Sequence, residues 1–460
     1  MEIPFLTNDI FDGNYPVNLY FHPEGWNGRP ALIGTPGLLL WRYPGNSGQV
    51  RMMYRMSDDL MYAVVGNTVY KVPESGSIVA LGTIGTIEGP ISAADSGPYL
   101  MFVDGVKGYY IKVSTHTLTE ITSSGFVSPS YVAFQDGFFL VLENHTDYIH
   151  KSALRDPTDW AALDYIGAER FSDHAFAIIS DHAELLVFGA KSVEVFYNSG
   201  AAAFPFTRVS GVFVERGIGA PHSLAKIDNS LFWLSDDWVV RRMEGYVPVV
   251  ISRPDMNTKI SKYKIKSDAI GFSYYKDGNA FYVLIFPSEN ATWQYNAATK
   301  QWNRMAYSAS HARHRANCYC YFAGKHLVGD YGNGKIYSLK DDVYTDDGEV
   351  VRRERIVPPV FSKNREKLFW HRVEVEHKAG VGLVTGQGDD PQAMLDWSDN
   401  GGRTWSNEHW RKIGKIGAFG VRSVWRMLGS SRNRILRWSM TDPVECVITG
   451  VYADISEGNH

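Results

Sequence analysis

Residues 185–198 read LLVFGAKSVEVFYN, and this stretch decides the fold. Two apolar runs, Leu185 to Phe188 and Val193 to Tyr197, flank a Gly-Ala-Lys-Ser turn. This pattern is typical of a tight antiparallel hairpin. The chain continues to residue 219 as SGAAAFPFTRVSGVFVERGIG. Strand propensity explains the hairpin, but it does not explain the closing phrase from Phe204 to Gly217.

The hairpin template recurs along the chain. Similar strand pairs around a turn occur at 100–113, 139–152, 231–243 and 326–339. The turns between strand pairs lie 38 to 48 residues apart, near Asp58, Ser96, Asp136, His182, Asn229, Asp277 and Gly324. A small sheet repeated about every 40–50 residues has the period of a β-propeller blade. Because one such sheet cannot cover its own faces, each blade must pack on its neighbours.

We therefore predict an all-β protein with a β-propeller of six or seven blades over residues 51–357. A row of unrelated hairpins within β-sandwiches is the alternative. Residues 1–50 are rich in Pro, Gly and Asn. We expect them to form an extended N-terminal segment that crosses other blades or subunits, or to add a strand that closes the propeller ring. After a linker at Ile356–Pro359, residues 358–460 are expected to form a C-terminal antiparallel β-domain that resembles a sandwich.

Composition excludes several classes of protein. The net charge of −4 over 460 residues does not indicate a nucleic-acid-binding surface that covers the whole molecule. No apolar run approaches the roughly 20 residues that span a bilayer, and the N-terminus lacks the pattern of a signal peptide. Three cysteines form no disulfide framework. We expect the chain to fold in a reducing cytoplasm, without a membrane-spanning segment.

One motif suggests a sugar-cleaving enzyme. Residues 398–405, SDNGGRTW, match the Asp-box of sialidase-type propellers, with Asn400 at the acidic position. Glycine and a short Asx side chain suit a hairpin turn, so the motif favours a folding role rather than a catalytic one. It occurs once and outside the repeats. A sialidase-like or glycan-binding propeller is nevertheless kept as the alternative function.

Other candidate sites have simpler interpretations. The run from Gly329 to Lys335 has P-loop spacing, but Ile336 replaces the hydroxyl residue and the context is strand–turn–strand. His311 and His314 precede Cys318 and Cys320, yet arginines between them oppose a metal cation. The acidic residues at 341–347 lack calcium-loop spacing. We predict no catalytic, cofactor-binding or metal-binding residues, and no enzymatic activity.

One charged feature stands out between His409 and Met440, where eight basic residues occur without an acidic one. Trp410, Trp425 and Trp438 are interleaved with them. Alternation at Arg422, Val424 and Arg426 predicts a strand with one basic face and one buried face. This surface is predicted to face DNA or an acidic partner, or else only solvent. The candidate residues are Arg411, Lys412, Lys415, Arg422, Arg426, Arg434 and Arg437, with Arg432 beside them.

The phrase from Phe204 to Gly217 resembles one protein family, and other segments match it in order along nearly the whole chain. This family is the packaged-DNA stabilisation proteins of short-tailed (podoviral) bacteriophages, also called tail accessory factors, tail nozzle or tail hub proteins. The matching segments are 16–18, 35–38, 156–160 (DPTDW), 194–200 (EVFYNSG), 204–208 (FPFTR), 215–217 (ERG), 228–234 and 344–348.

The resemblance implies a structural protein of the virion tail that is assembled in the host cytoplasm. Such proteins form a ring, typically a homohexamer, below the portal and its adaptor ring. They extend the DNA channel, help to retain packaged double-stranded DNA, and dock tailspikes or tail fibres and a tail needle. A ring subunit needs rigid β-structure and broad contact surfaces but no active site.

Overall fold

The predicted hairpin forms the centre of a four-stranded antiparallel sheet. The structure, a computed structural model, describes residues 14–168, 174–362 and 364–458. In it, β17 (Glu184–Gly189) pairs with β18 (Val193–Asn198), and Phe188 lies opposite Val193. The Gly189 amide donates to the Ser192 carbonyl at 2.8 Å and closes the turn. β16 (Ala175–Asp181) and β19 (Phe206–Arg208) complete this sheet.

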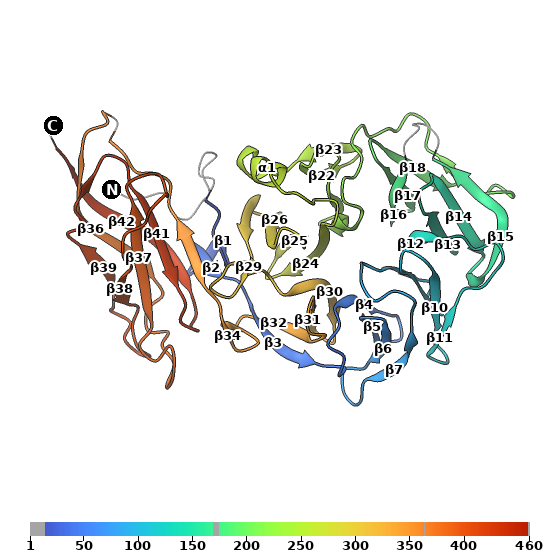
Figure 1. The fold of residues 1–460 in the computed structure, drawn as a ribbon, viewed down its shortest axis with the longest axis horizontal. Helices are drawn as coiled ribbons and strands as arrows, with labels where there is room; N and C mark the ends of the chain where they lie inside the picture. Colours follow the sequence, from blue (N-terminus) through green and yellow to red (C-terminus); the bar gives the residue numbers. More distant parts are fainter. Residues whose placement is uncertain (1–13, 169–173, 363, 459–460) are drawn as a thin grey trace.

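Seven such sheets follow one another in the described residues and form the blades of a propeller, on the right in Figure 1. The fourth blade is β16–β19, described above. The first three blades are β4 (Val50–Arg55), β5 (Met61–Val65), β6 (Thr68–Val72) and β7 (Val79–Thr83); β8 (Ser92–Asp95), β9 (Tyr99–Val103), β10 (Gly108–Lys112) and β11 (Thr117–Glu120); and β12 (Pro129–Gln135), β13 (Phe138–Glu143), β14 (Tyr148–Ala153) and β15 (Asp156–Gly167).

The later blades carry small additions. The fifth is β20 (Ala225–Ile227), β21 (Ser230–Leu234), β22 (Val240–Glu244) and β23 (Val247–Val250), and the sixth is β24 (Ile270–Lys276), β25 (Asn279–Phe286), β26 (Ala291–Asn296) and β27 (Gln301–Arg304). The seventh combines β30 (Ala316–Phe322), β31 (Lys325–Asp330) and β32 (Ile336–Lys340) with β3 (Gly37–Arg42). Short elements between or beside them are η1 (Pro221–Ser223), α1 (Pro254–Ser261), β28 (Ala306–Tyr307), β29 (Ala312–Arg313), β33 (Thr345–Asp346) and β34 (Glu349–Val350).

The ring closes through the N-terminal segment. β3 pairs antiparallel with β32, with Leu38 opposite Leu339, so a strand from the start of the chain completes the last blade. That blade then packs on the first one: Val50 shares a buried cluster with Leu327 and Ile336. The predicted propeller is therefore present, and its blades bury apolar faces that a single sheet would leave exposed.

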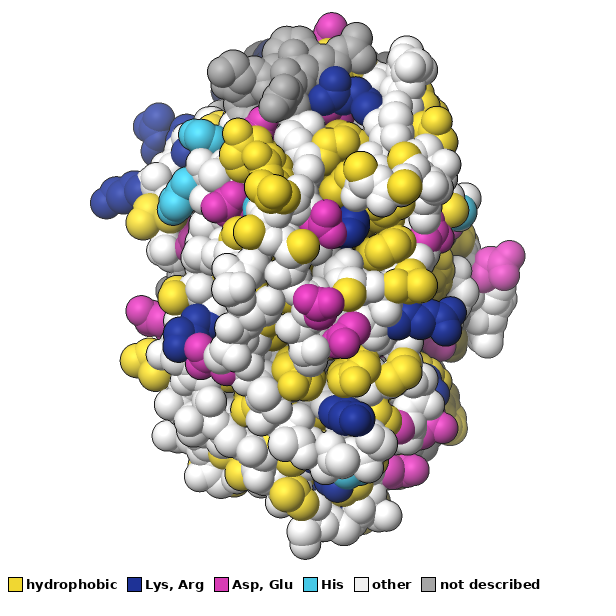
Figure 2. Space-filling model, turned by 90° about the vertical axis from the view of Figure 1, so that its right-hand side faces the viewer, with side chains coloured by type: hydrophobic (Ala, Val, Ile, Leu, Met, Phe, Trp, Pro, Cys, Tyr) yellow, Lys and Arg dark blue, Asp and Glu magenta, His cyan; other side chains and the backbone are white. Residues whose placement is uncertain are grey.

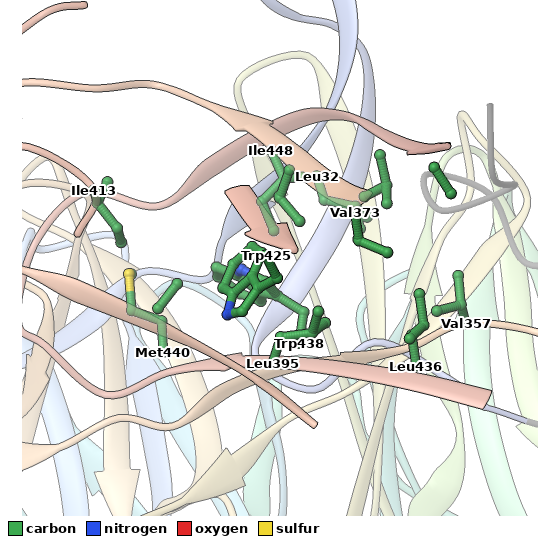
Figure 3. Close-up of a cluster of buried hydrophobic side chains, with 14 of the residues drawn as sticks. Leu32, Val357, Val373, Leu395, Ile413, Trp425, Leu436, Trp438, Met440 and Ile448 are labelled. Carbon is green, nitrogen blue, oxygen red and sulfur yellow. The ribbon is translucent and has the colours of Figure 1, made fainter. Parts of the chain in front are cut away.

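The second domain is a β-sandwich, on the left in Figure 1. One sheet contains β1 (Leu19–Trp26), β2 (Arg29–Gly34), β42 (Val447–Glu457), β36 (Leu368–His377), β39 (Ser423–Arg426) and β40 (Ser430–Ser431). The other contains β35 (Arg353–Ile356), β41 (Ile435–Met440), β37 (Gln392–Ser398) and β38 (His409–Lys412). Figure 3 shows their shared core, in which Trp425 and Trp438 lie at the centre. The predicted sandwich fold is confirmed, with β1 and β2 as additional strands.

Residues 14–20 connect the two domains. Val17 forms backbone bridges to both Arg304 in the propeller and Glu354 in the sandwich. The Asn18 carboxamide donates to the carbonyls of Ala306 and Arg352 at 2.9 Å each, and accepts from the Ala306 amide at 2.8 Å. These buried hydrogen bonds fix the sandwich against the sixth blade. No helix in the described part of the chain is long and apolar enough to cross a bilayer.

Candidate interaction surface

The structure brings five of the seven predicted basic residues together at the outer end of the sandwich, where β38 and β39 lie in Figure 1. These five side chains are exposed, and they are Arg411, Lys412, Lys415, Arg422 and Arg426. β38 and β39 are edge strands of different sheets, joined by side chains across the edge. The Trp425 indole donates to the His409 carbonyl at 2.6 Å, and Arg411 donates to the Val424 carbonyl at 2.9 Å.

The predicted alternation along β39 is confirmed. Ser423 and Trp425 are buried, whereas Arg422 and Arg426 are exposed and point to the opposite face. The strand therefore presents its basic side chains to solvent, because Trp425 on the opposite face belongs to the core of the sandwich.

Acidic neighbours reduce the charge of this surface. Lys412 pairs with Asp390 at 2.6 Å, and Arg422 pairs with Glu374 at 3.2 Å. Among the described residues, no carboxylate lies within ion-pair distance of Arg411, Lys415 or Arg426, and the Arg411 guanidinium donates to the carbonyls of Val424 and Trp410 instead. These three side chains therefore carry most of the uncompensated positive charge.

The prediction is wrong for two members of the surface, Arg434 and Arg437. The Arg434 side chain is only 2% exposed and donates two hydrogen bonds to the Asp399 carboxylate. Its guanidinium lies 5.0 Å from the Trp397 ring and 5.3 Å from the Trp370 ring. Arg437 is half-buried, pairs with Asp396 and lies 4.1 Å over the Trp405 ring. Both are structural cations, because their strand β41 lies inside its sheet and they are paired there with carboxylates.

The Asp-box is a folded turn of the sandwich. The Asn400 side-chain oxygen accepts hydrogen bonds from the amides of Arg403 and Thr404 at 3.1 and 3.0 Å. Gly401 and Gly402 adopt positive φ angles of 74° and 85°, which favour glycine. The motif connects β37 to β38, outside the propeller, as a folding element would.

The cysteines of the histidine–cysteine motif and the glycine-rich motif both lie in the seventh blade. In the described residues no group of three or more His, Cys, Asp or Glu side chains could hold a metal ion. Burial lowers the pKa of His314 to about 4 and raises the pKa of Cys318 to about 12. The run from Gly329 to Lys335 covers the end of β31 and the turn to β32, where Asp330 accepts from the Gly332 amide at 2.6 Å.

The axis of the propeller was not identified from the sequence. The Tyr131 and His222 rings stack there, with centroids 5.4 Å apart and planes 20° from parallel. Tyr131 borders two cavities, one of about 380 Å³ beside β8 and β16 and one of about 220 Å³ beside β24 and β30. Burial raises the pKa of Tyr131 to about 12 and lowers the pKa of His222 to about 4. The sequence repeat could have located the axis, because the first strand of each blade lines it.

The segments 156–160, 194–200, 204–208 and 215–217, which carried the family resemblance, stabilise the third and fourth blades. Glu194 is buried and pairs with Arg208 at 2.5 Å, which joins β18 to β19. The Trp160 indole donates to the Pro157 carbonyl at 2.7 Å. A Cβ at Gly217 would lie 2.3 Å from the Gly189 carbonyl oxygen, so only glycine fits against that hairpin.

Comparisons with known proteins agree with this architecture. Residues 7–344 match the family profile described as "Bacteriophage P22 Gp10, beta-propeller", and residues 352–456 match "Bacteriophage P22 Gp10, beta-sandwich". A comparison with curated protein sequences gave no match.

Similar solved structures include one titled "YCF48 bound to D1 peptide", at 9% identity and a TM-score of 0.42, covering 67% of this chain and 98% of the other. The mitotic checkpoint complex matches at 11% identity and a TM-score of 0.40, covering 66% and 94%. The computationally designed Ika8 protein matches at 12% identity and a TM-score of 0.39, covering 73% and 99%.

Proposed function

Because the chain belongs to the bacteriophage P22 Gp10 family of phage stabilisation proteins, we propose that it is a ring-forming subunit of a short phage tail. In this role six copies form a ring that extends the channel of the portal and its adaptor ring. The ring helps to retain packaged double-stranded DNA, and the role involves no chemical reaction.

The stacked Tyr131 and His222 rings at the axis of the propeller are the observation that supports a ring most directly. The two cavities on this axis have volumes of about 380 and 220 Å³, and the Tyr131–His222 stack lies between blades at their border. A B-form duplex has a major groove that is alone about 12 Å wide. DNA therefore does not fit through one chain, and a channel for it has to be formed between copies.

The partners in this proposal are the adaptor ring, tailspikes or tail fibres, and a tail needle. The propeller offers surfaces of the required kind. Figure 2 shows its end opposite the sandwich, where small groups of hydrophobic side chains lie among acidic and basic ones. Exposed apolar residues of the third blade include Leu154 and Leu163, which are 63% and 86% exposed. Mixed surfaces of this type are typical of protein interfaces.

Mass photometry of the purified chain with its adaptor ring tests the proposal. We expect ring-sized oligomers that contain several copies of the chain. A chain that stays monomeric even in the presence of the adaptor ring would contradict ring formation.

A further inference from the structure

The sandwich contains a pocket that the tail role does not explain. It has a volume of about 630 Å³ and lies on the outer face of the sheet formed by β36, β39 and β42. Three aromatic residues border it, namely Trp26, Phe419 and Tyr452, together with Glu374, Glu376 and Arg422. Small-molecule sites of proteins have volumes of about 300–1,000 Å³ and combine apolar walls with a few polar groups.

Two glycines shape the aromatic walls. A Cβ at Gly380 would lie 2.6 Å from the Phe419 ring, so this ring lies directly on the glycine backbone. A Cβ at Gly450 would lie 3.0 Å from the Tyr452 hydroxyl. Tyr452 thus extends over Gly450 towards Glu376, whose carboxylate accepts its hydroxyl at 3.4 Å. Phe419 remains 77% exposed and Tyr452 41% exposed, so both rings are accessible to a ligand.

Charged side chains of both signs line the pocket. Glu374 pairs with Arg422 at 3.2 Å and with Arg372 at 3.5 Å, and Glu376 is the second acid. Glu374, Glu376 and Arg422 line the pocket, whereas Arg372 lies outside the lining and only pairs with Glu374. The nearby His377 is neutral near pH 7, because burial lowers its pKa to about 4. Glu376 would repel an anionic ligand and Arg422 would repel a cationic one. The site therefore favours a ligand without net charge.

We propose that this pocket binds a neutral hexopyranose segment of a bacterial surface polysaccharide. The apolar C–H face of a pyranose ring packs on an exposed aromatic ring, which offers a large apolar and electron-rich face. Its hydroxyl groups hydrogen-bond to Glu376 as acceptor and to Arg422, which has five N–H donors in a planar fork. The proposal rests on the phage family only in its choice of a bacterial polysaccharide as the source of the sugar. It does not depend on the assembly of the chain into a ring.

Saturation-transfer NMR tests the pocket with lipid-free surface polysaccharide purified from the bacterial strain that the phage infects. We expect transfer from aromatic protons of the protein to sugar-ring protons. Trp26→Ala should weaken binding about tenfold, which corresponds to about 1.4 kcal/mol. The matched control is Trp410→Ala, because Trp410 is 47% exposed on the same domain but lies outside the pocket. Its binding should be unchanged.

Three outcomes would overturn the proposal. The first is no transfer to the polysaccharide, and the second is binding that requires the lipid portion of intact lipopolysaccharide. The third is a Trp26→Ala variant that binds glycan normally but fails to assemble with the adaptor ring, which would make the pocket a protein-docking site. Mass photometry of the unchanged protein with the adaptor ring tests the tail role separately, so the two failures are distinguishable.

Discussion

The Arg434 guanidinium donates two hydrogen bonds, each 2.7 Å long, to the carboxylate of Asp399. A third goes to the Leu428 carbonyl at 2.6 Å. Asp399 belongs to the Asp-box turn, so this pair ties that turn to β41. The relationship gives the Asp-box a structural role: Asp399, which precedes Asn400 at the acidic position of the motif, is the counter-ion of a buried cation.

Replacing Asp399 by alanine should destabilise the sandwich. The Arg434 side chain would remain buried without its counter-ion, which costs about 3 kcal/mol. Urea unfolding followed by tryptophan fluorescence measures the change. Asp389→Ala is the matched control, because Asp389 is exposed on the same domain, and it should change stability by less than about 0.5 kcal/mol. Equal midpoints for both variants would contradict the assigned role.

Gly217→Ala should destabilise the propeller by about 1–3 kcal/mol. The added methyl group would meet main-chain atoms of Gly189 and Ala190, at 2.3 and 2.4 Å, that cannot rotate away. Thermal unfolding checks this prediction. Gly420→Ala serves as the control, since a Cβ there meets nothing within 4 Å. If both variants have the same melting temperature as the unchanged protein, the close approach at Gly217 does not contribute to stability.

Stability should fall as the pH falls from about 6.5 towards 4. His314 is buried and its pKa is lowered to about 4, so below 6.5 the unfolded chain binds more protons than the folded one. His314→Asn should therefore flatten this part of the pH profile relative to the unchanged protein. His174→Asn, at an exposed position, is the control for the substitution itself. Urea midpoints between pH 7.5 and 4.5 provide the measurement.

All three thiols should be unreactive in the folded protein. Burial raises the pKa values of Cys318, Cys320 and Cys446 to about 12, 11 and 12. Only the thiolate attacks a disulfide reagent, so little reactive form exists at pH 8. Ellman's reagent should modify three thiols after unfolding and fewer than one before it. Rapid modification of the native protein would show that one of these side chains is accessible.

Charge reversal tests the basic surface that the sequence predicted. Arg422→Glu together with Arg426→Glu should weaken binding of DNA or of an acidic neighbour about tenfold or more, because like charges then face each other. Arg426→Glu alone disturbs no ion pair among the described residues and separates this effect from the loss of the Glu374 partner. The control is Lys262→Glu with Lys264→Glu, two exposed positions on the propeller. Particles that assemble, retain DNA and infect normally would show that the surface faces only solvent.

The sequence by itself determined the all-β class and the blade period. A hairpin such as Phe188 opposite Val193 forms between residues that are close in the chain, so its turn and alternation are visible locally. The same holds for β39, where the alternation of Arg422, Ser423, Val424 and Trp425 correctly separated the exposed face from the buried face.

Only the tertiary structure decided the rest. Leu38 pairs with Leu339, and this pairing depends on which blade edge is left open when the ring closes. Arg434 and Arg426 are each followed by two apolar residues, yet one lies inside a sheet beside Asp399 and the other on an outer face. Burial and charge pairing are set by residues far away in the chain, whereas strand alternation is set by neighbours. This is why the pattern predicted the blades but could not select the basic side chains that reach solvent.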